Sequence, residues 1–157
     1  MESKLELVLV GDIPAGLDLE PLQRVFGLAA ASTTALKLPY GVINLTFVDD
    51  ETIRVMNLEY SGHDYATDVL SFNYLESGGP IEEVIGEMVV GIETAARQAE
   101  AAGTSLSEEV ALLVLHGTLH IGGYDHQDEA SQEHMQRLQR EIMEEAGYKF
   151  REFQWSE

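Results

Sequence analysis

The stretch SLSEEVALLVLHGTLHIGGYDH, residues 105–126, decides the architecture expected of this chain. Ser105 and Glu108 form a capping box, which is a typical start of a helix. Residues 110–115 are all apolar, so this helix lacks a polar face and is expected in the middle of the fold. Gly122-Gly123 then ends it, because glycine accepts the left-handed conformation that reverses a chain.

Three of the five histidines of the chain lie in this stretch, namely His116, His120 and His126. On a helix, His116 and His120 project from one face with Cβ atoms roughly 5–6 Å apart, and one metal ion bridges such a pair at about 2.0–2.1 Å from each nitrogen. A continuous helix would carry His126 about 15 Å beyond His116, so the chain must turn at the two glycines. Three imidazoles leave a fourth position for water, as in catalytic zinc sites. We therefore expect one divalent ion, zinc, in a hydrolytic site.

Other interpretations of these histidines stay open. They could be core or surface histidines without a metal, or Asp125 or Asp128 could close a structural site as a fourth ligand. The zinc protease signature H-E-x-x-H-x-x-G-x-x-H has the same ligand spacing, but its glutamate base falls on Gly117 here. The remaining histidines, His63 in a polar loop and His134 on the last helix, are expected to be solvated.

Composition narrows the class of protein. The 157 residues, 45% hydrophobic and 24% charged, predict one globular domain over residues 1–157. The absence of cysteine excludes disulfides and thiolate ligands, so any metal must use histidine or carboxylate. No segment is long and apolar enough to span a membrane and no leader pattern opens the chain, so we expect a cytoplasmic protein. The formal charge of −19, with scattered basic residues, is unfavourable for binding a polyanion.

Hydrophobic periodicity and capping residues predict an alternation of strands and helices. Strands are expected at Leu5–Val10, Val42–Val48, Asp68–Phe72 and Ile85–Gly91. Helices are expected from an N-cap at Asp18 to the middle thirties, from Asp49-Asp50 to about Tyr60, over Glu93–Ala102, from Ser105 onward, and through Met135 and Ile142 to just before Gly147. This order predicts a single α/β (α+β) domain with a mixed four-stranded sheet and about five helices.

Three motifs resemble one known family. His116-Gly-Thr-Leu-His120-Ile-Gly-Gly123-Tyr-Asp-His126 resembles the H-G-x-L-H-x-x-G-Y-D-H signature of the YbeY family. Residues 67–72, TDVLSF, and residues 85–90, IGEMVV, resemble its T-D-V-L-S-F segment and its L-G-D-I-V-I strand. With Asn57, Tyr60 and Asp64 also in place, the resemblance extends from about residue 40 to about residue 145.

The resemblance implies a bacterial metal-dependent endoribonuclease of ribosomal RNA maturation, with His116, His120 and His126 as the metal ligands. The family usually has an arginine after the Tyr60 position, beside the metal cleft, where this chain has Ser61. A guanidinium there could hold a scissile phosphate with two hydrogen bonds, and serine cannot replace its charge. Ala66 also stands where proline is usual.

Several polar residues near these motifs could have a structural role or a role in the chemistry. Asp125 could accept a hydrogen bond from a ligand imidazole or could stabilise the turn. Asp68 is more typical of a turn or cap than of a substrate-binding carboxylate. Tyr124 is interpreted as packing. Ser61 and His63 complete the candidates for catalysis, His63 as a source of positive charge in place of the arginine.

The function expected is that of a single-strand-type endoribonuclease, which cleaves RNA by metal-assisted hydrolysis of phosphodiesters in ribosomal RNA maturation and ribosome quality control. The alternatives are a zinc-dependent peptidase or small amide hydrolase, which suits the negative charge, and a ribosome assembly factor that acts by binding and has a residual metal site. The charge is compatible with an RNA substrate if a ribosomal protein or an assembly GTPase presents the RNA. Neither DNA nor a membrane is expected as a partner.

Overall fold

A four-stranded sheet in the order β1-β2-β4-β3 forms the base of the structure. The computed structural model describes residues 4–33, 36, 40–75, 83–124 and 128–148. Strands β1 (Lys4–Val10), β2 (Tyr40–Val48) and β4 (Val84–Gly91) are parallel, whereas β3 (Val69–Asn73) pairs antiparallel with β4. The predicted mixed four-stranded sheet is therefore confirmed.

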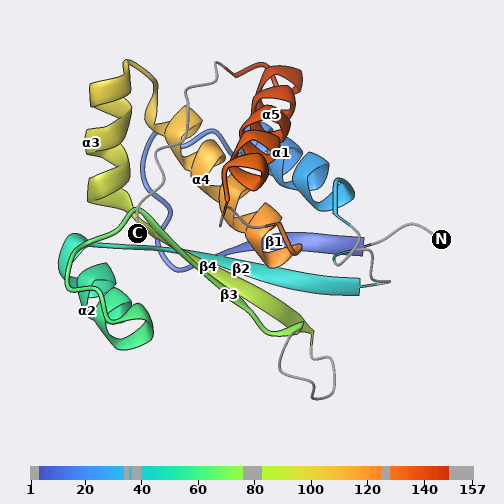
Figure 1. Cartoon of the computed structure of the whole chain (residues 1–157). Helices are drawn as coiled ribbons and strands as arrows, with labels where there is room; N and C mark the ends of the chain where they lie inside the picture. Colours follow the sequence, from blue (N-terminus) through green and yellow to red (C-terminus); the bar gives the residue numbers. More distant parts are fainter. Residues whose placement is uncertain (1–3, 34–35, 37–39, 76–82, 125–127, 149–157) are drawn as a thin grey trace.

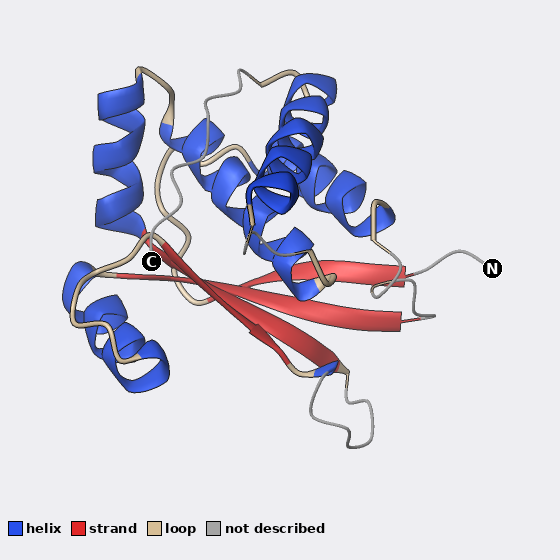
Figure 2. Ribbon diagram, in the orientation of Figure 1, coloured by secondary structure: helices blue, strands red, loops and turns tan. Residues whose placement is uncertain are grey.

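Five helices in the described residues cover this sheet. They are α1 (Leu19–Ala31), α2 (Asp50–Ser61), α3 (Ile92–Ala102), α4 (Leu106–Ile121) and α5 (Glu129–Glu145). Figure 1 shows α1, α4 and α5 stacked over one face of the sheet, while α2 lies against the opposite face. The layers are easiest to follow in Figure 2, where the strands form one twisted surface. None of the helices in the described ranges is long and apolar enough to cross a membrane.

Helix α4 lies between the sheet and the outer helices, as its apolar sequence predicts. The side chains of Val110 to Leu115 are at most 1% exposed. The capping box is present, with the Glu108 N–H donating to Ser105 Oγ (3.1 Å) and the Ser105 N–H donating to Glu108 Oε1 (2.9 Å). Burial of an apolar helix on all sides removes a large hydrophobic area from water and fixes its position in the fold.

Helix α1 begins where the sequence predicts, but the Asp18 side chain does not cap it. Asp18 occupies the N-cap position, but its side chain makes no capping hydrogen bond. Its backbone N–H donates instead to Ser107 Oγ on α4 (2.9 Å), so a contact between two helices replaces the local cap. By contrast, α2 begins at Asp50 as predicted, with Asp49 as its N-cap accepting from the Thr52 N–H (2.8 Å). Hydrogen bonds from the Thr52 side chain and backbone lower the pKa of the Asp49 carboxyl group.

Helix α1 ends at Ala31, before the middle thirties that periodicity predicts. The Ser32 hydroxyl donates to Leu28 O (2.9 Å) and the Thr33 hydroxyl to Ala30 O (3.1 Å), and such side-chain bonds compete with helix propagation. Thr33 also packs against the end of α4, where a Cβ at Gly122 would lie 2.3 Å from Thr33 Cγ2. The side-chain hydrogen bonds of Ser32 and Thr33 thus account for the early end of α1, and the packing of Thr33 against Gly122 holds the chain there.

Gly117 allows α4 to approach the sheet closely. A Cβ at this position would lie 2.6 Å from Sδ of Met88, a fully buried residue of β4, and 3.8 Å from Ser71 Cβ of β3. A larger residue would force the helix away from the strands, because a packed core has few voids to absorb added volume. The glycine is therefore required by packing.

We expect Gly117→Ala to lower the free energy of unfolding by about 1–3 kcal/mol, because one extra methyl group overpacks the contact with Met88. Gly27→Ala is the matched control, since Gly27 is an exposed helical glycine with no atom within 4 Å of its added Cβ. That substitution should be neutral or stabilise by up to about 1 kcal/mol. Urea denaturation of both variants measures the difference, and equal stability of the two would contradict the packing role.

Candidate metal centre

The last two turns of α4 present the candidate ligands His116 and His120. Their ring centroids lie 5.4 Å apart, consistent with two imidazoles four residues apart on one helical face. His116 is buried, at 7% exposed, and His120 is half-buried. The C-terminal end of a helix carries partial negative charge, which favours a cation beside His120. The donor type and spacing therefore fit a divalent ion such as zinc.

Gln139 of α5 fixes the orientation of the His116 ring. Its Oε1 lies 2.9 Å from His116 Nδ1, and its side chain is fully buried. Since an amide oxygen only accepts hydrogen bonds, Nδ1 carries the proton and the lone pair of the neutral ring lies on Nε2. The Gln139 amide nitrogen lies 3.4 Å from Gln136 Oε1, which supports this orientation of the amide. His116 is thus prepared to bind a metal through Nε2.

The chain turns directly after His120. Gly122 has φ −77° and Gly123 has φ +103°, so Gly123 alone takes a positive φ, and the expectation of left-handed geometry does not hold for Gly122. The reason for glycine at 122 is instead its close contact with Thr33. The Tyr124 N–H donates to Leu119 O (3.0 Å) and its hydroxyl donates to Ser32 O (2.9 Å), which agrees with the packing role expected of Tyr124.

The third candidate ligand, His126, lies outside the described residues, as does Asp125. Within the part of the chain that the structure describes, no group of three histidine or acidic side chains is arranged to hold a metal. Asp128, the alternative fourth ligand, accepts from the Ser131 N–H (2.8 Å) as the N-cap of α5, which lowers its pKa. The convergence of three histidines on one ion therefore stays a prediction, and Asp128 has a structural role.

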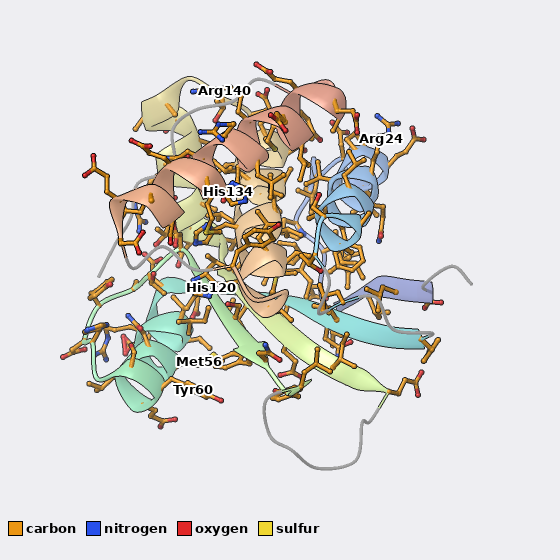
Figure 3. All side chains as sticks on the ribbon, turned by 45° about the vertical axis from the view of Figure 1, so that its right-hand side comes forward. Arg24, Met56, Tyr60, His120, His134 and Arg140 are labelled. Atoms are coloured by element: carbon orange, nitrogen blue, oxygen red, sulfur yellow. The ribbon has the colours of Figure 1, made fainter. Side chains whose placement is uncertain are left out.

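A pocket of about 330 Å³ opens beside His120. Helix α2, strand β3 with the residue after it, and the end of α4 contribute its lining: Tyr60, Ser71, Phe72, Asn73, Tyr74, His120 and Ile121. In Figure 3, His120 lies at the end of α4, with Tyr60 and Met56 of α2 below it, while Arg24 and Arg140 lie on the upper part of the molecule. The candidate metal centre thus borders a space large enough for part of a substrate.

Two polar side chains of this pocket are held in place. Asn73 Nδ2 donates to Ile121 O (2.9 Å), and Asn73 Oδ1 accepts from the Leu75 N–H (2.9 Å). The Tyr74 hydroxyl donates to Glu87 Oε2 (2.9 Å). Burial and the neighbouring Glu87 carboxylate raise the pKa of Tyr74 to about 12, so this phenol stays protonated at neutral pH.

The candidates Ser61 and His63 lie together but do not line the pocket beside His120. Ser61 Oγ lies 2.8 Å from Asn57 O and 2.6 Å from Asn57 Oδ1, so the hydroxyl hydrogen bonds back to its own helix. It also lies 3.2 Å from Nδ1 of His63, an exposed ring whose centroid is 5.9 Å from that of Tyr65. Their contacts are local, at the C-terminal end of α2.

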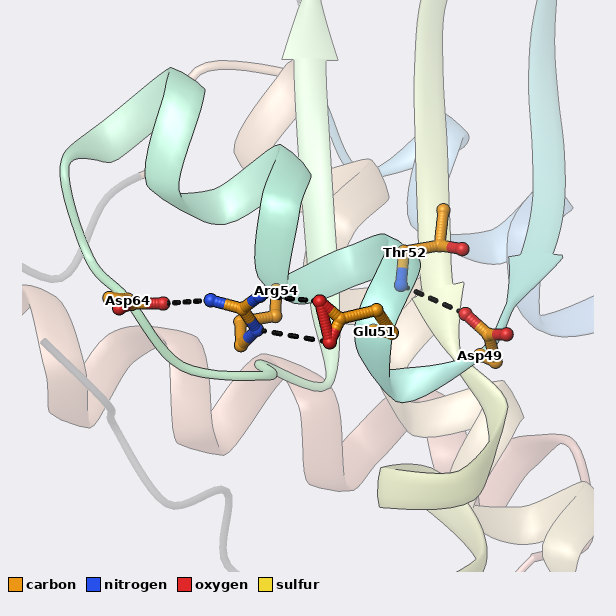
Figure 4. A network of polar contacts seen from close by, with 5 residues as sticks. All are labelled: Asp49, Glu51, Thr52, Arg54 and Asp64. Atoms are coloured by element: carbon orange, nitrogen blue, oxygen red, sulfur yellow. Dashed lines mark hydrogen bonds and ion pairs between the residues drawn. The ribbon is translucent and has the colours of Figure 1, made fainter.

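Arg54 does not replace the arginine that the family resemblance leads one to expect. It is bound by Glu51 of the same helix and by Asp64 of the following loop, as Figure 4 shows, and these two carboxylates raise its pKa above the usual value. Arg24 and Arg97 are likewise paired, with Glu20 (3.0 Å) and Asp50 (2.9 Å). These pairs are exposed, so each is weak, but they reduce the positive charge offered to a phosphate.

Two further residues take the roles expected of them. The backbone N–H of Val69 donates to Asp68 Oδ1 (2.7 Å), and the Asp68 carbonyl accepts from the Gly91 N–H (2.8 Å), which supports the structural interpretation of Asp68. His134 is exposed on α5, as predicted, although its ring centroid lies 5.5 Å from that of Tyr124.

Comparison with known proteins agrees with the motifs. The sequence profile of the family described as Endoribonuclease YbeY matches residues 19–147. The chain belongs to the YbeY family. A relative of that description from Limosilactobacillus reuteri is 34% identical over 156 residues, covering 91% of this chain and 98% of the relative. One from Moorella thermoacetica is 38% identical over 146 residues, covering 87% and 92%, respectively.

The fold is also found in a solved structure. The solution structure of TM1509 from Thermotoga maritima is similar with a TM-score of 0.56 and 23% identity, covering 88% of this chain and 90% of that chain. At this identity the likeness shows the fold alone. The YbeY resemblance and the mixed α/β architecture predicted from sequence are confirmed.

Gln139 is the residue of this YbeY family member that sequence reasoning missed. It lies four residues after Met135 and three before Ile142 on the buried face of α5, so a polar side chain interrupts an apolar stripe. Such an interruption signals a buried hydrogen bond, because buried polar groups are nearly always paired. The identity of its partner, 23 residues away in sequence, depends on how α4 and α5 pack.

We expect Gln139→Leu to weaken Zn²⁺ binding by about 10- to 100-fold, because the His116 ring loses the acceptor that fixes its orientation and tautomer. Gln139→Glu keeps an acceptor at the same distance and should bind the ion at least as well as the parent chain. Competition titration with a chromophoric chelator measures both affinities. Equal affinity of the leucine variant and the parent would show that Gln139 has only a packing role.

Proposed function

We propose that this chain is a metal-dependent endoribonuclease that cleaves single-stranded RNA in ribosomal RNA maturation and ribosome quality control. One divalent ion, zinc, would be held by His116, His120 and His126. The observation that carries the proposal is the pair of imidazoles with centroids 5.4 Å apart, beside a pocket, in a member of the YbeY family. The relatives described as endoribonucleases support RNA as the substrate.

The chemistry divides between the ion and the residues around it. A divalent ion at this site supplies Lewis acidity and lowers the pKa of water. Gln139 orients His116, and the C-terminal end of α4 favours positive charge at His120. Asp125 is the candidate acceptor for the second ring nitrogen of a ligand histidine. Ser61 and His63 are less favoured for catalysis, because their contacts are local to the end of α2.

The peptidase alternative is disfavoured by packing as well as by sequence. Gly117 occupies the position of the protease general base, and its backbone lies directly against Met88 of the sheet. A glutamate side chain has no room there without displacement of a fully buried methionine. A peptidase mechanism would need its base from another element.

The charge distribution opposes the unaided binding of naked RNA by this chain. Arg24, Arg54 and Arg97 are each paired with carboxylates, and the chain carries a formal charge of −19. Affinity for naked RNA depends chiefly on contacts between phosphates and free cationic groups. We therefore propose that a ribosomal protein or an assembly GTPase presents the RNA to this chain.

We expect His116→Ala and His120→Ala to lose both the metal and RNA hydrolysis while the fold persists, because a three-ligand site rarely tolerates the loss of one ligand. Elemental analysis, circular dichroism and a cleavage assay on single-stranded RNA, with and without chelator, measure the three properties. His134→Ala removes an exposed histidine of α5 and is the matched control, which should keep metal and activity. Stoichiometric metal and full turnover in either ligand variant would refute the assignment.

A second prediction concerns the position after Tyr60. We expect Ser61→Arg to strengthen RNA cleavage roughly tenfold at low salt, as one charge-assisted phosphate contact of about 1.5 kcal/mol would allow. The gain should shrink as salt rises, because exposed charges are screened. Cleavage of a structured RNA by metal-saturated protein at two ionic strengths measures the effect.

Gln23→Arg adds the same charge on α1 and is the control for non-specific attraction. An equal gain in both variants would mean that net charge matters and position does not. Rapid cleavage by the parent chain, unaffected by Ser61→Arg, would mean that another group binds the phosphate. An absence of cleavage in both would favour the ribosome assembly factor that acts by binding, or the peptidase.

A further inference from the structure

Two of the aromatic side chains that line the pocket beside His120 are exposed to solvent and are not part of the hydrophobic core. Tyr60 is 68% exposed and Tyr74 is 41% exposed, although both line the pocket. The Tyr60 ring packs against Phe72, with centroids 4.2 Å apart and planes at 58°. Because Phe72 is only 7% exposed, it forms a fixed support for a ring that remains largely open to solvent. Tyr60 thus has the form of a preorganised stacking platform.

The charges around this platform are unfavourable for a phosphate group. The lining residues of the described pocket include neither lysine nor arginine. On the helix that carries Tyr60, Arg54 is paired with Glu51 and Asp64, and the Glu87 carboxylate accepts a hydrogen bond from the Tyr74 hydroxyl. The part of a nucleotide that suits such a pocket is its neutral base, since stacking on an aromatic ring does not require positive charge.

The polar groups of the pocket suit any base rather than one. Asn73 uses both its amide nitrogen and its amide oxygen in hydrogen bonds to the backbone of Ile121 and Leu75. The Tyr74 hydroxyl donates to Glu87. The Ser71 hydroxyl can both donate and accept, so it is compatible with either kind of base edge. Recognition therefore depends on the ring face, which all four bases share.

We propose that this pocket binds one unpaired nucleobase of RNA, stacked on Tyr60, next to the phosphodiester that is cleaved. The proposal rests on the proposed function, because His120 links the pocket to the metal centre. A base in a duplex is stacked and paired, so only a single-stranded region can place one here. The pocket would give the enzyme a preference for unpaired RNA without strong base specificity, and binding that depends little on salt.

The test uses the full chain saturated with Zn²⁺ and an unstructured RNA dodecamer carrying one 2-aminopurine. Quenching of its fluorescence reports stacking, and gel analysis of the same samples reports cleavage. Tyr60→Leu and Tyr60→Ala should weaken binding about 5- to 150-fold, as for the loss of one stacked base. Tyr60→Phe keeps the ring and should bind like the parent. Tyr40→Ala removes a tyrosine that is 44% exposed outside the pocket and should change nothing.

The possible outcomes separate the base-binding proposal from the endoribonuclease function on which it rests. If the parent chain cleaves RNA but Tyr60→Leu binds and cleaves like Tyr60→Phe, the base-binding pocket is refuted and the endoribonuclease stands. If binding falls steeply with salt and equally in all variants, phosphate contacts dominate and the pocket is again refuted. If the metal-loaded parent neither binds nor cleaves the dodecamer, the pocket proposal is refuted, because base stacking needs no partner protein, and the proposed function is then left to presentation of the RNA by a ribosomal protein or an assembly GTPase.

Discussion

Burial of α4 is the constraint on which the rest of the structure depends. Its residues from Val110 to Leu115 are apolar without interruption, and the fold must cover the helix on all sides. The sheet lies beneath it and α1, α3 and α5 pack around it. A helix held this way carries whatever follows in its sequence to a fixed place, so His116 and His120 are positioned by hydrophobic packing of the turns before them.

The burial of α4 also means that its polar side chain His116 needs a hydrogen-bond partner inside the protein. An imidazole at 7% exposure requires a hydrogen-bond partner, and Gln139 supplies one from the neighbouring helix. The partner also leaves Nε2 as the only basic nitrogen of the ring. The contact between His116 and Gln139 thus satisfies a buried polar group and also orients a candidate metal ligand.

The negative charge of the protein acts in opposite ways on its two expected ligands, a divalent cation and RNA. A formal charge of −19 and the negative end of α4 favour a divalent cation, whereas they oppose the approach of a polyanion. The exposed rings of Tyr60 and Tyr74 offer a base-stacking contact to RNA, on which the negative charge of the protein has little effect. An acidic nuclease can therefore be consistent with an RNA substrate when a partner brings the RNA and the pocket binds an unpaired base.

The sequence by itself determined the features that depend on neighbours within a few residues. The capping box of α4, the start of α2 after Asp49, the alternation of strands with helices, and the shared face of His116 and His120 follow from local hydrogen bonds and from hydrophobic periodicity. The motif spacing also identified the family, because it is specific in order and in residue type.

Only the tertiary structure decided which distant residues meet. Asp18 is satisfied by Ser107, α1 ends where Thr33 meets Gly122, and His116 bonds Gln139, none of which is encoded in a window of one helical turn. The pocket likewise combines residues of α2, β3 and α4. Such contacts are selected by how whole elements pack, because many partners are chemically equivalent until the packing of helices and sheet brings one of them within reach.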